Sequence, residues 1–136
     1  MRTHHFVLAL TIPFALATTA CGSDVEEDAF ADCEGRAYTA TIVAPEDGAS
    51  DVPTDVRVRI QWAGGIPDRY LSMTTQTGQP VASDGGGTDE NGDYDLYAFV
   101  PATQYTLRAG WFCVIDGGAS QKDYPLTTST FTTAAP

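Results

Sequence analysis

Few side chains in this sequence are suited to chemistry. The chain has three cysteines and two histidines, and both histidines, His4 and His5, lie within the first five residues. Histidine is the side chain most often used in general acid-base catalysis, and it is a common zinc ligand. Removal of an amino-terminal targeting segment would leave no histidine and a single lysine, Lys122. We therefore expect a protein that is not an enzyme.

The amino end has the organisation of a secretory signal peptide. A short basic start is followed by a mostly apolar run from Phe6 to Ala17 and by small residues up to Ala20. The apolar run is shorter than the roughly 20 residues that a membrane-spanning helix needs, and Pro13 interrupts it. We expect residues 1–20 to be a signal peptide that is removed on export.

The junction after this run resembles the lipobox of bacterial lipoproteins. It reads Thr18-Thr19-Ala20-Cys21-Gly22-Ser23, with Thr18 where that family usually has leucine. The resemblance implies that Cys21 is lipidated, becomes the first residue, and anchors the protein to a membrane of the cell envelope. In this family Gly22, rather than Asp, is compatible with transport to the outer membrane where the host has one. The alternative is an ordinary cut near Ala20, which leaves Cys21 as a free thiol.

Cysteine parity favours lipidation of Cys21. An exported chain with three cysteines cannot pair all of them within itself. Lipidation of Cys21 leaves Cys33 and Cys113 free to pair with each other. Their disulfide would close a loop of about 80 residues and restrict the unfolded chain strongly. We therefore predict a Cys33–Cys113 disulfide.

Residues 21–35 are expected to be the lipidated cysteine and an acidic tether. The stretch from Gly22 to Gly35 has no basic residue, and its only large apolar side chains are Val25 and Phe30. Like charges extend such a segment and keep the attached domain away from an anionic lipid surface. An acidic docking motif for a basic partner is the alternative. The acidic residues are Asp24, Glu26, Glu27, Asp28, Asp32 and Glu34.

The charge of the chain argues against nucleic-acid binding. The sequence has 7 basic and 18 acidic side chains, which gives a formal net charge of −11. Affinity for phosphate comes from clustered lysine and arginine, and the basic residues here are scattered. We expect contact with a membrane through the lipid and no nucleic-acid partner.

From Arg36 onward the sequence is typical of an all-β domain. Val56 to Trp62 alternates apolar and polar residues, so its apolar side chains share one face, and Tyr105 to Ile115 alternates in the same way. Turn residues recur at roughly ten-residue spacing between such segments. Further strands are expected at Tyr38 to Ala44, Tyr70 to Thr75, Pro80 to Ala82, Tyr94 to Val100 and Thr127 to Thr133.

These strands predict one domain over residues 36–136. A sheet with one polar face must cover its apolar face, and about 100 residues is the size of two packed sheets. We therefore expect a two-sheet antiparallel β-sandwich of about seven strands. A domain of this length buries only roughly 60–70% of its unfolded surface, so a disulfide would matter to its stability.

Three segments of this domain resemble the bacterial Ig-like domain of the SbsA type. APEDGASDVPTDVRVRIQW (Ala44 to Trp62) is similar to its first two strands, PATQYTLRAG (Pro101 to Gly110) to a later strand, and TSTFTTAAP (Thr128 to Pro136) to its last strand. The resemblance covers about Tyr38 to Pro136 and implies an Ig-like fold. Members are usually noncatalytic spacers or adhesion modules of envelope proteins, so the partners implied are envelope proteins or polysaccharide.

The resemblance also constrains the predicted disulfide. In an Ig sandwich the first strand and the strand that would carry Cys113 run in the same direction. Cys33 precedes the first predicted strand, whereas Cys113 lies near the end of its own strand. We therefore expect the tether to fold back along the sandwich if the two sulfur atoms meet.

The acidic stretch 84–95 contains a candidate metal site. Asp89, Asn91 and Asp93 alternate in the sequence, and calcium is bound by six to eight oxygen ligands that such side chains supply. The pattern of the EF-hand calcium loop does not continue, because Tyr94 stands where that loop has glycine and Val100 where it has glutamate. A calcium site is therefore one alternative, and a solvated hairpin loop without a cofactor is the other.

Aromatic residues are the second candidate binding feature. Between residues 94 and 100 either alternation could face inward, so that either Tyr94 or the pair Tyr97 and Phe99 would be exposed to a sugar or a partner protein. The function that we expect first is that of a structural, spacer or adhesion module. The alternative is a module that binds calcium or carbohydrate through the acidic stretch and these aromatic residues. The aromatic residues expected in the core are Trp62, Tyr105, Trp111 and Phe131.

Overall fold

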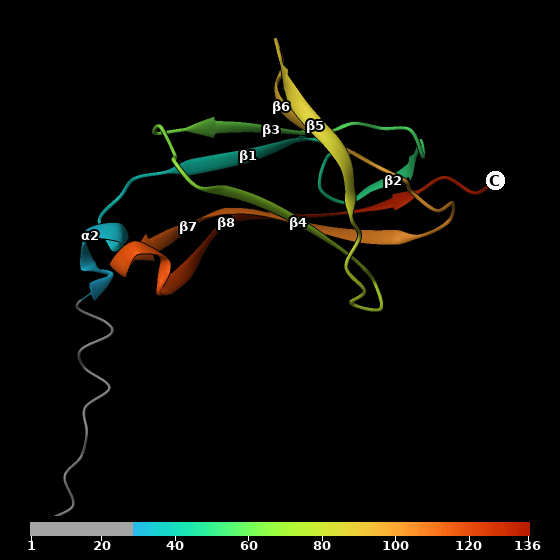
Figure 1. The fold of residues 1–136 in the computed structure, drawn as a ribbon. Helices are drawn as coiled ribbons and strands as arrows, with labels where there is room; N and C mark the ends of the chain where they lie inside the picture. The colour runs from blue at the N-terminus through green and yellow to red at the C-terminus, as the bar shows by residue number, and fades with distance from the viewer. Residues whose placement is uncertain (1–28) are drawn as a thin grey trace, which may run out of the picture.

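The computed structural model describes residues 29–136, which form two four-stranded sheets packed face to face (Figure 1). This confirms the predicted all-β sandwich. Within these residues, a short helix, α2 (Ala31–Glu34), precedes the first strand, and a 3-10 turn, η1 (Asp116–Gly118), joins the last two. No helix in this range is long and apolar enough to cross a membrane. The strands are β1 (Thr39–Ala44), β2 (Ala49–Val52), β3 (Val58–Ala63), β4 (Arg69–Thr75), β5 (Ser83–Asp89), β6 (Gly92–Tyr97), β7 (Gln104–Ile115) and β8 (Ser120–Thr133).

The strand order is β1-β3-β6-β5 in one sheet and β2-β8-β7-β4 in the other. All neighbours are antiparallel except β2 and β8, which are parallel. Residues 29–136 thus contain eight strands, in agreement with the prediction of about seven, and β2–β8 is the one parallel pair in this otherwise antiparallel part of the chain. One strand that the sequence missed is β2, because it is only four residues long and Asp51 within it has a left-handed backbone (φ 55°). So short and irregular a strand has no alternation to detect.

Two other strand predictions need correction. The strand predicted at Pro80 to Ala82 is reduced to a single bridge between Thr74 and Pro80, because proline has no N–H to donate to a ladder. The acidic stretch predicted as a loop forms a β-hairpin, in which β5 and β6 are paired from Ser83 with Tyr97 to Asp89 with Gly92. Three consecutive glycines conceal β5 in the sequence, because glycine has a low β propensity.

The main core lies between the two sheets. Its largest fully buried side chains are those of Val58, Tyr105, Leu107 and Phe131, and β3 and β7 bury the faces that their alternation predicts. The ring of Phe99 meets Tyr105 and Phe131 edge-on, at centroid distances of 5.0 and 5.4 Å. These aromatic contacts join β7 and β8 to the segment that follows β6.

A second apolar cluster closes one end of the sandwich. Figure 1 shows α2 beside the end of the long β7–β8 hairpin, and Phe30 packs there with Ile66 and Trp111. The Trp111 ring stacks on Tyr124 at 4.6 Å between centroids and meets the edge of Tyr38 at 4.9 Å. Residues before the first strand therefore take part in the hydrophobic core.

The turn between β6 and β7 is held by two buried side chains. The Thr133 hydroxyl donates to the carbonyl oxygen of Val100 (2.7 Å) and accepts from the N–H of Thr103 (3.0 Å). The Val100 N–H donates in turn to the Tyr105 hydroxyl (2.8 Å). Because Thr133 is only 2% exposed, water cannot replace its hydroxyl.

Replacing Thr133 with valine keeps the shape of the side chain and removes these bonds. We expect Thr133→Val to lower the free energy of unfolding by about 1–3 kcal/mol, because the backbone groups of Val100 and Thr103 lose their buried side-chain partner. Thr128→Val, at an exposed position of the same strand, is the control and should change stability by less than about 0.5 kcal/mol. Urea denaturation of both variants measures the difference, and equal midpoints would contradict the assignment.

Candidate functional site

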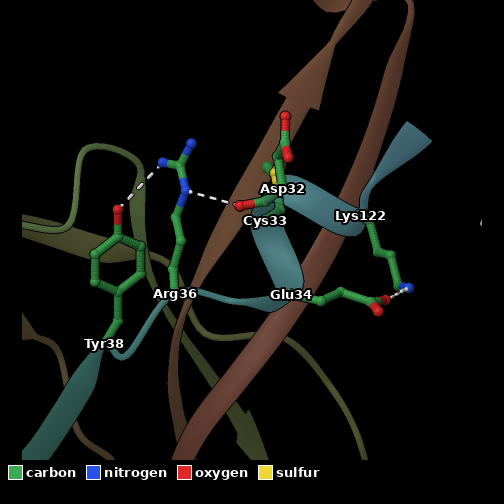
Figure 2. Close-up of a disulfide and its surroundings, with 7 residues drawn as sticks. Asp32, Cys33, Glu34, Arg36, Tyr38 and Lys122 are labelled. Atoms are coloured by element: carbon green, nitrogen blue, oxygen red, sulfur yellow. Dashed lines mark hydrogen bonds and ion pairs between the residues drawn. A yellow bond between two sulfur atoms is a disulfide. The ribbon is translucent and has the colours of Figure 1, made fainter. Parts of the chain in front are cut away.

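The two cysteines predicted to pair form a disulfide in the structure. Cys33 in α2 is bonded to Cys113 in β7, with 6.3 Å between their Cα atoms (Figure 2). The expectation that β1 and β7 run in the same direction is wrong. Tyr38, just before β1, contacts Trp111 near the end of β7, so β1 begins where β7 ends. For this reason Cys33 reaches Cys113 without folding back along the sandwich.

The last part of the predicted tether belongs to the folded domain. Phe30 and Cys33 are buried, because the disulfide and the apolar contacts of Phe30 hold this segment despite its negative charge. Lys122 of β8 donates to Glu34 at 2.6 Å, and Arg36 donates to the carbonyl oxygen of Asp32 at 3.3 Å (Figure 2). We call α2, the Cys33–Cys113 bond and the Glu34–Lys122 ion pair the amino-terminal clamp.

Cys21, the predicted site of lipidation, lies outside residues 29–136, and so do the signal peptide and the acidic residues from Asp24 to Asp28. Lipidation of Cys21 therefore stays a prediction. The predicted carboxyl end of the acidic tether needs correction, because the chain is already packed on the sandwich at Phe30.

The calcium site suggested by Asp89, Asn91 and Asp93 is not assembled. The partner of Asp93 across the hairpin is Thr88, the neighbour of Asp89, so the side chains of Asp89 and Asp93 project from opposite faces of the sheet. Alternation along one strand would have put them on one face, but the turn between β5 and β6 separates them. Within residues 29–136, no three histidine, cysteine or acidic side chains are grouped to hold a metal ion.

Asp89 is instead part of an ion pair on the outer face of the sheet. It accepts two hydrogen bonds from Arg59, at 2.6 and 2.7 Å, and one from the N–H of Asn91 at 2.8 Å. The bond from Arg59, followed by the one from Asn91, lowers the pKa of the Asp89 carboxyl. These bonds use the carboxylate oxygens that the predicted metal ion would have needed.

The candidate binding aromatics divide between core and surface. Tyr97 and Phe99 are 7% and 8% exposed and belong to the main core, so their proposed contact with a ligand is wrong. They face inward because Phe99 fills the space against Tyr105. Tyr94 is half-buried on the outer face, where its ring covers Gly87 and lies beneath the Arg57 guanidinium at 4.9 Å. This packing gives Tyr94 a structural partner on each side.

A groove of about 420 Å³ opens beside Trp62. Three strands supply its main side chains: Trp62 comes from β3, Arg69 from β4 and Asp93 from β6. The Arg69 guanidinium lies over the Trp62 ring, 5.6 Å from its centroid, and it donates to the Asp93 carboxylate. We call this the Trp62 groove. Its other lining residues are Thr39, Thr41, Ile60, Gln61, Ala63 and Gly92.

The groove lies where β6 stops covering β3. The ladder between these strands ends at the pair Ile60 and Asp93, so the residues of β3 beyond Ile60 have no ladder partner in β6. Gln61 and Trp62 are consecutive and therefore project to opposite faces of the strand, yet both line the groove. The groove thus passes across this uncovered strand edge.

A second hollow of about 170 Å³ shares Trp62, Arg69 and Asp93 with the first. It adds Asp95, whose pKa is raised, first by burial and further by the charge of Asp93, while a hydrogen bond from the Tyr97 hydroxyl at 3.3 Å opposes the rise. The Arg69–Asp93 ion pair therefore stands between two connected recesses.

Sequence reasoning placed Trp62 in the core and did not single out Arg69 or Gln61. Trp62 does pack against both apolar clusters, but it also lines the groove. Asp93 was singled out for a calcium site that does not form. The only indication of the groove in the sequence was Trp62, an aromatic residue near the end of a strongly alternating strand. The groove itself depends on how far β6 overlaps β3, which the sequence does not show.

No protein-family model matches this chain, and no curated protein matches it. Function is therefore inferred from the residues and from the geometry of the domain.

Proposed function

We propose that the protein is an exported, lipid-anchored module of the cell envelope with a structural, spacer or adhesion role. The observation that carries this proposal is the Cys33–Cys113 disulfide. The chain has three cysteines and the disulfide uses two, so Cys21 is left at the position where a lipobox has its lipidated residue. A structural disulfide also fits export, because such bonds persist in oxidising compartments.

We further propose that this module is Ig-like, from its resemblance to bacterial Ig-like domains of the SbsA type. The resembling segment Ala44 to Trp62 contains β2 and all but the last residue of β3, Pro101 to Gly110 contains the start of β7, and Thr128 to Pro136 contains the end of β8. Each therefore falls on strands of an all-β sandwich, as the resemblance implies. On this basis we propose envelope proteins or polysaccharide as partners and a noncatalytic role.

The amino-terminal clamp limits how far the domain would extend from the lipid. Between Cys21 and Ala29 the chain makes eight residue steps, which span at most about 29 Å when fully extended. A tether that continued to Gly35 would reach about 50 Å. The clamp would therefore keep the α2 end of the sandwich closer to the membrane than a fully solvated tether would.

Replacing Cys21 with serine tests the anchor. We expect the wild-type protein to partition into the detergent phase on detergent phase separation and Cys21→Ser to move to the aqueous phase, because an acyl anchor is the source of membrane affinity in this proposal. The control is the double variant Cys33→Ala/Cys113→Ala, which loses the disulfide but should stay in the detergent phase. Wild-type protein found in the aqueous phase would contradict the proposal.

A further inference from the structure

We propose that the Trp62 groove binds a neutral saccharide, held by Trp62, Gln61, Arg69 and Asp93. The inference deepens the binding role within the proposed function, and it does not depend on the lipid anchor. The Arg69–Asp93 ion pair, which bridges β4 and β6, is the polar centre of the site.

The side chains of the groove match the chemistry of a sugar. One face of a pyranose ring presents C–H groups, which pack on apolar surface such as the part of the Trp62 side chain that lines the groove beside the Arg69 guanidinium. Its hydroxyl groups donate and accept, and they are bound well by planar side chains with fixed geometry. Asp93 offers a carboxylate acceptor, Arg69 offers several donors and Gln61 offers both, around the one aromatic ring of the groove.

These groups are held in place before any ligand arrives. Arg69 is positioned by its bond to Asp93 and by the Trp62 ring beneath it. Asp93 also accepts from the Thr88 hydroxyl at 2.6 Å, and its strand is paired with β3 on one side and with β5 on the other. A site made of pre-positioned side chains loses little conformational entropy on binding. The volume of the groove is within the range of about 300–1,000 Å³ that is typical of small-ligand sites.

The charge of the groove disfavours an anionic ligand. Arg69 is its cation and is already paired with Asp93, while the adjoining recess adds the Asp95 carboxyl. A uronic acid or a phosphate would meet two acidic side chains and one neutralised arginine, in a chain whose formal net charge is −11. Hydroxyl groups meet no such repulsion, and they can share the charged hydrogen bonds of the ion pair.

The two tryptophans of the chain make the test specific. Trp62 lines the groove, whereas Trp111 is 3% exposed in the cluster beneath α2. The full chain, kept in a detergent without a sugar head group, is titrated with tetrasaccharides of glucose, mannose, xylose and N-acetylglucosamine, while the indole N–H signals are followed by NMR. We expect at least one of them to shift the Trp62 signal saturably and to leave the Trp111 signal unchanged. Tetragalacturonic acid, which is anionic, should shift neither.

Variants separate binding from folding. Asp93→Asn should weaken binding about tenfold, the loss expected from one charged hydrogen bond. Trp62→Phe should retain more affinity than Trp62→Ala, because it keeps an aromatic face. Gln61→Ala changes an exposed side chain and should weaken binding without unfolding the domain, whereas Gln121→Ala, an exposed glutamine on β8, should not weaken it.

Three results would overturn the inference: no shift of the Trp62 signal with any of the four neutral tetrasaccharides, a shift of the Trp62 signal with the anionic probe, or equal shifts at Trp62 and Trp111. None of these NMR results depends on whether the chain carries a lipid anchor. The partition of wild-type protein and Cys21→Ser between detergent and water still tests the lipid anchor, so failure of the groove and failure of the anchor are distinguishable.

Discussion

Replacing Cys33 and Cys113 together with alanine is expected to lower the free energy of unfolding by about 4 kcal/mol, because the bond closes a long loop in the unfolded chain. The two cysteines are 80 residues apart in sequence, and both are buried in the cluster beneath α2. A domain of this size has a total stability of about 5–15 kcal/mol, so the loss would be a large part of it. Urea denaturation followed by tryptophan fluorescence measures the change.

Two controls identify the cause of this loss. Wild-type protein under reducing conditions should lose a similar amount of stability, because the same bond is broken without a change of side chain. Hydrogen exchange should show the amides of Ala31–Glu34 losing protection before those of β7 and β8, since the bond ties α2 to the sandwich. Unchanged stability of the double variant would contradict the role given to the clamp.

Phe131→Ala is expected to cost about 3–5 kcal/mol, the range for removing a large aromatic side chain from a core. Phe131 is 1% exposed, and its ring contacts Phe99 at 5.4 Å and Tyr105 at 5.4 Å. Its removal would leave a cavity between the strands of the two sheets, lined by rings that have lost their partner. The midpoint of urea denaturation should fall accordingly.

Val100→Ala is the control for this core substitution. Val100 is 59% exposed, so its truncation should change stability by less than about 0.5 kcal/mol. Equal losses for Phe131→Ala and Val100→Ala would mean that Phe131 is not at the centre of the core.

The sandwich could be predicted from the sequence where strands are long and have one polar face. Val58, Ile60 and Trp62 alternate with polar residues, and this alternation is enough to orient β3. The same reasoning failed for β5, because only its pairing with β6 shows that this segment is a strand. A Cβ on Gly86 would lie 2.4 Å from the carbonyl oxygen of Tyr94, so glycine is required by close approach rather than by a turn.

The site was less predictable, because it depends on relations between strands. The turn between β5 and β6 decides that Asp89 and Asp93 face opposite sides, and no spacing in the sequence contains that information. The Trp62 groove depends on the end of the β3–β6 ladder at Ile60 and on the distant Arg69 reaching across from β4. The disulfide was the exception, since the lipobox resemblance assigned Cys21 to lipidation and left only Cys33 and Cys113 to pair.

The anchor and the clamp are tested together by one measurement, the mass of the protein isolated from membranes without reduction. We expect a chain that begins at Cys21, carries acyl groups on that residue, and yields a peptide in which Cys33 is joined to Cys113. A mass that corresponds to a chain beginning at Met1, or to a chain with no acyl group and with free thiols at Cys33 and Cys113, would contradict both the anchor and the clamp.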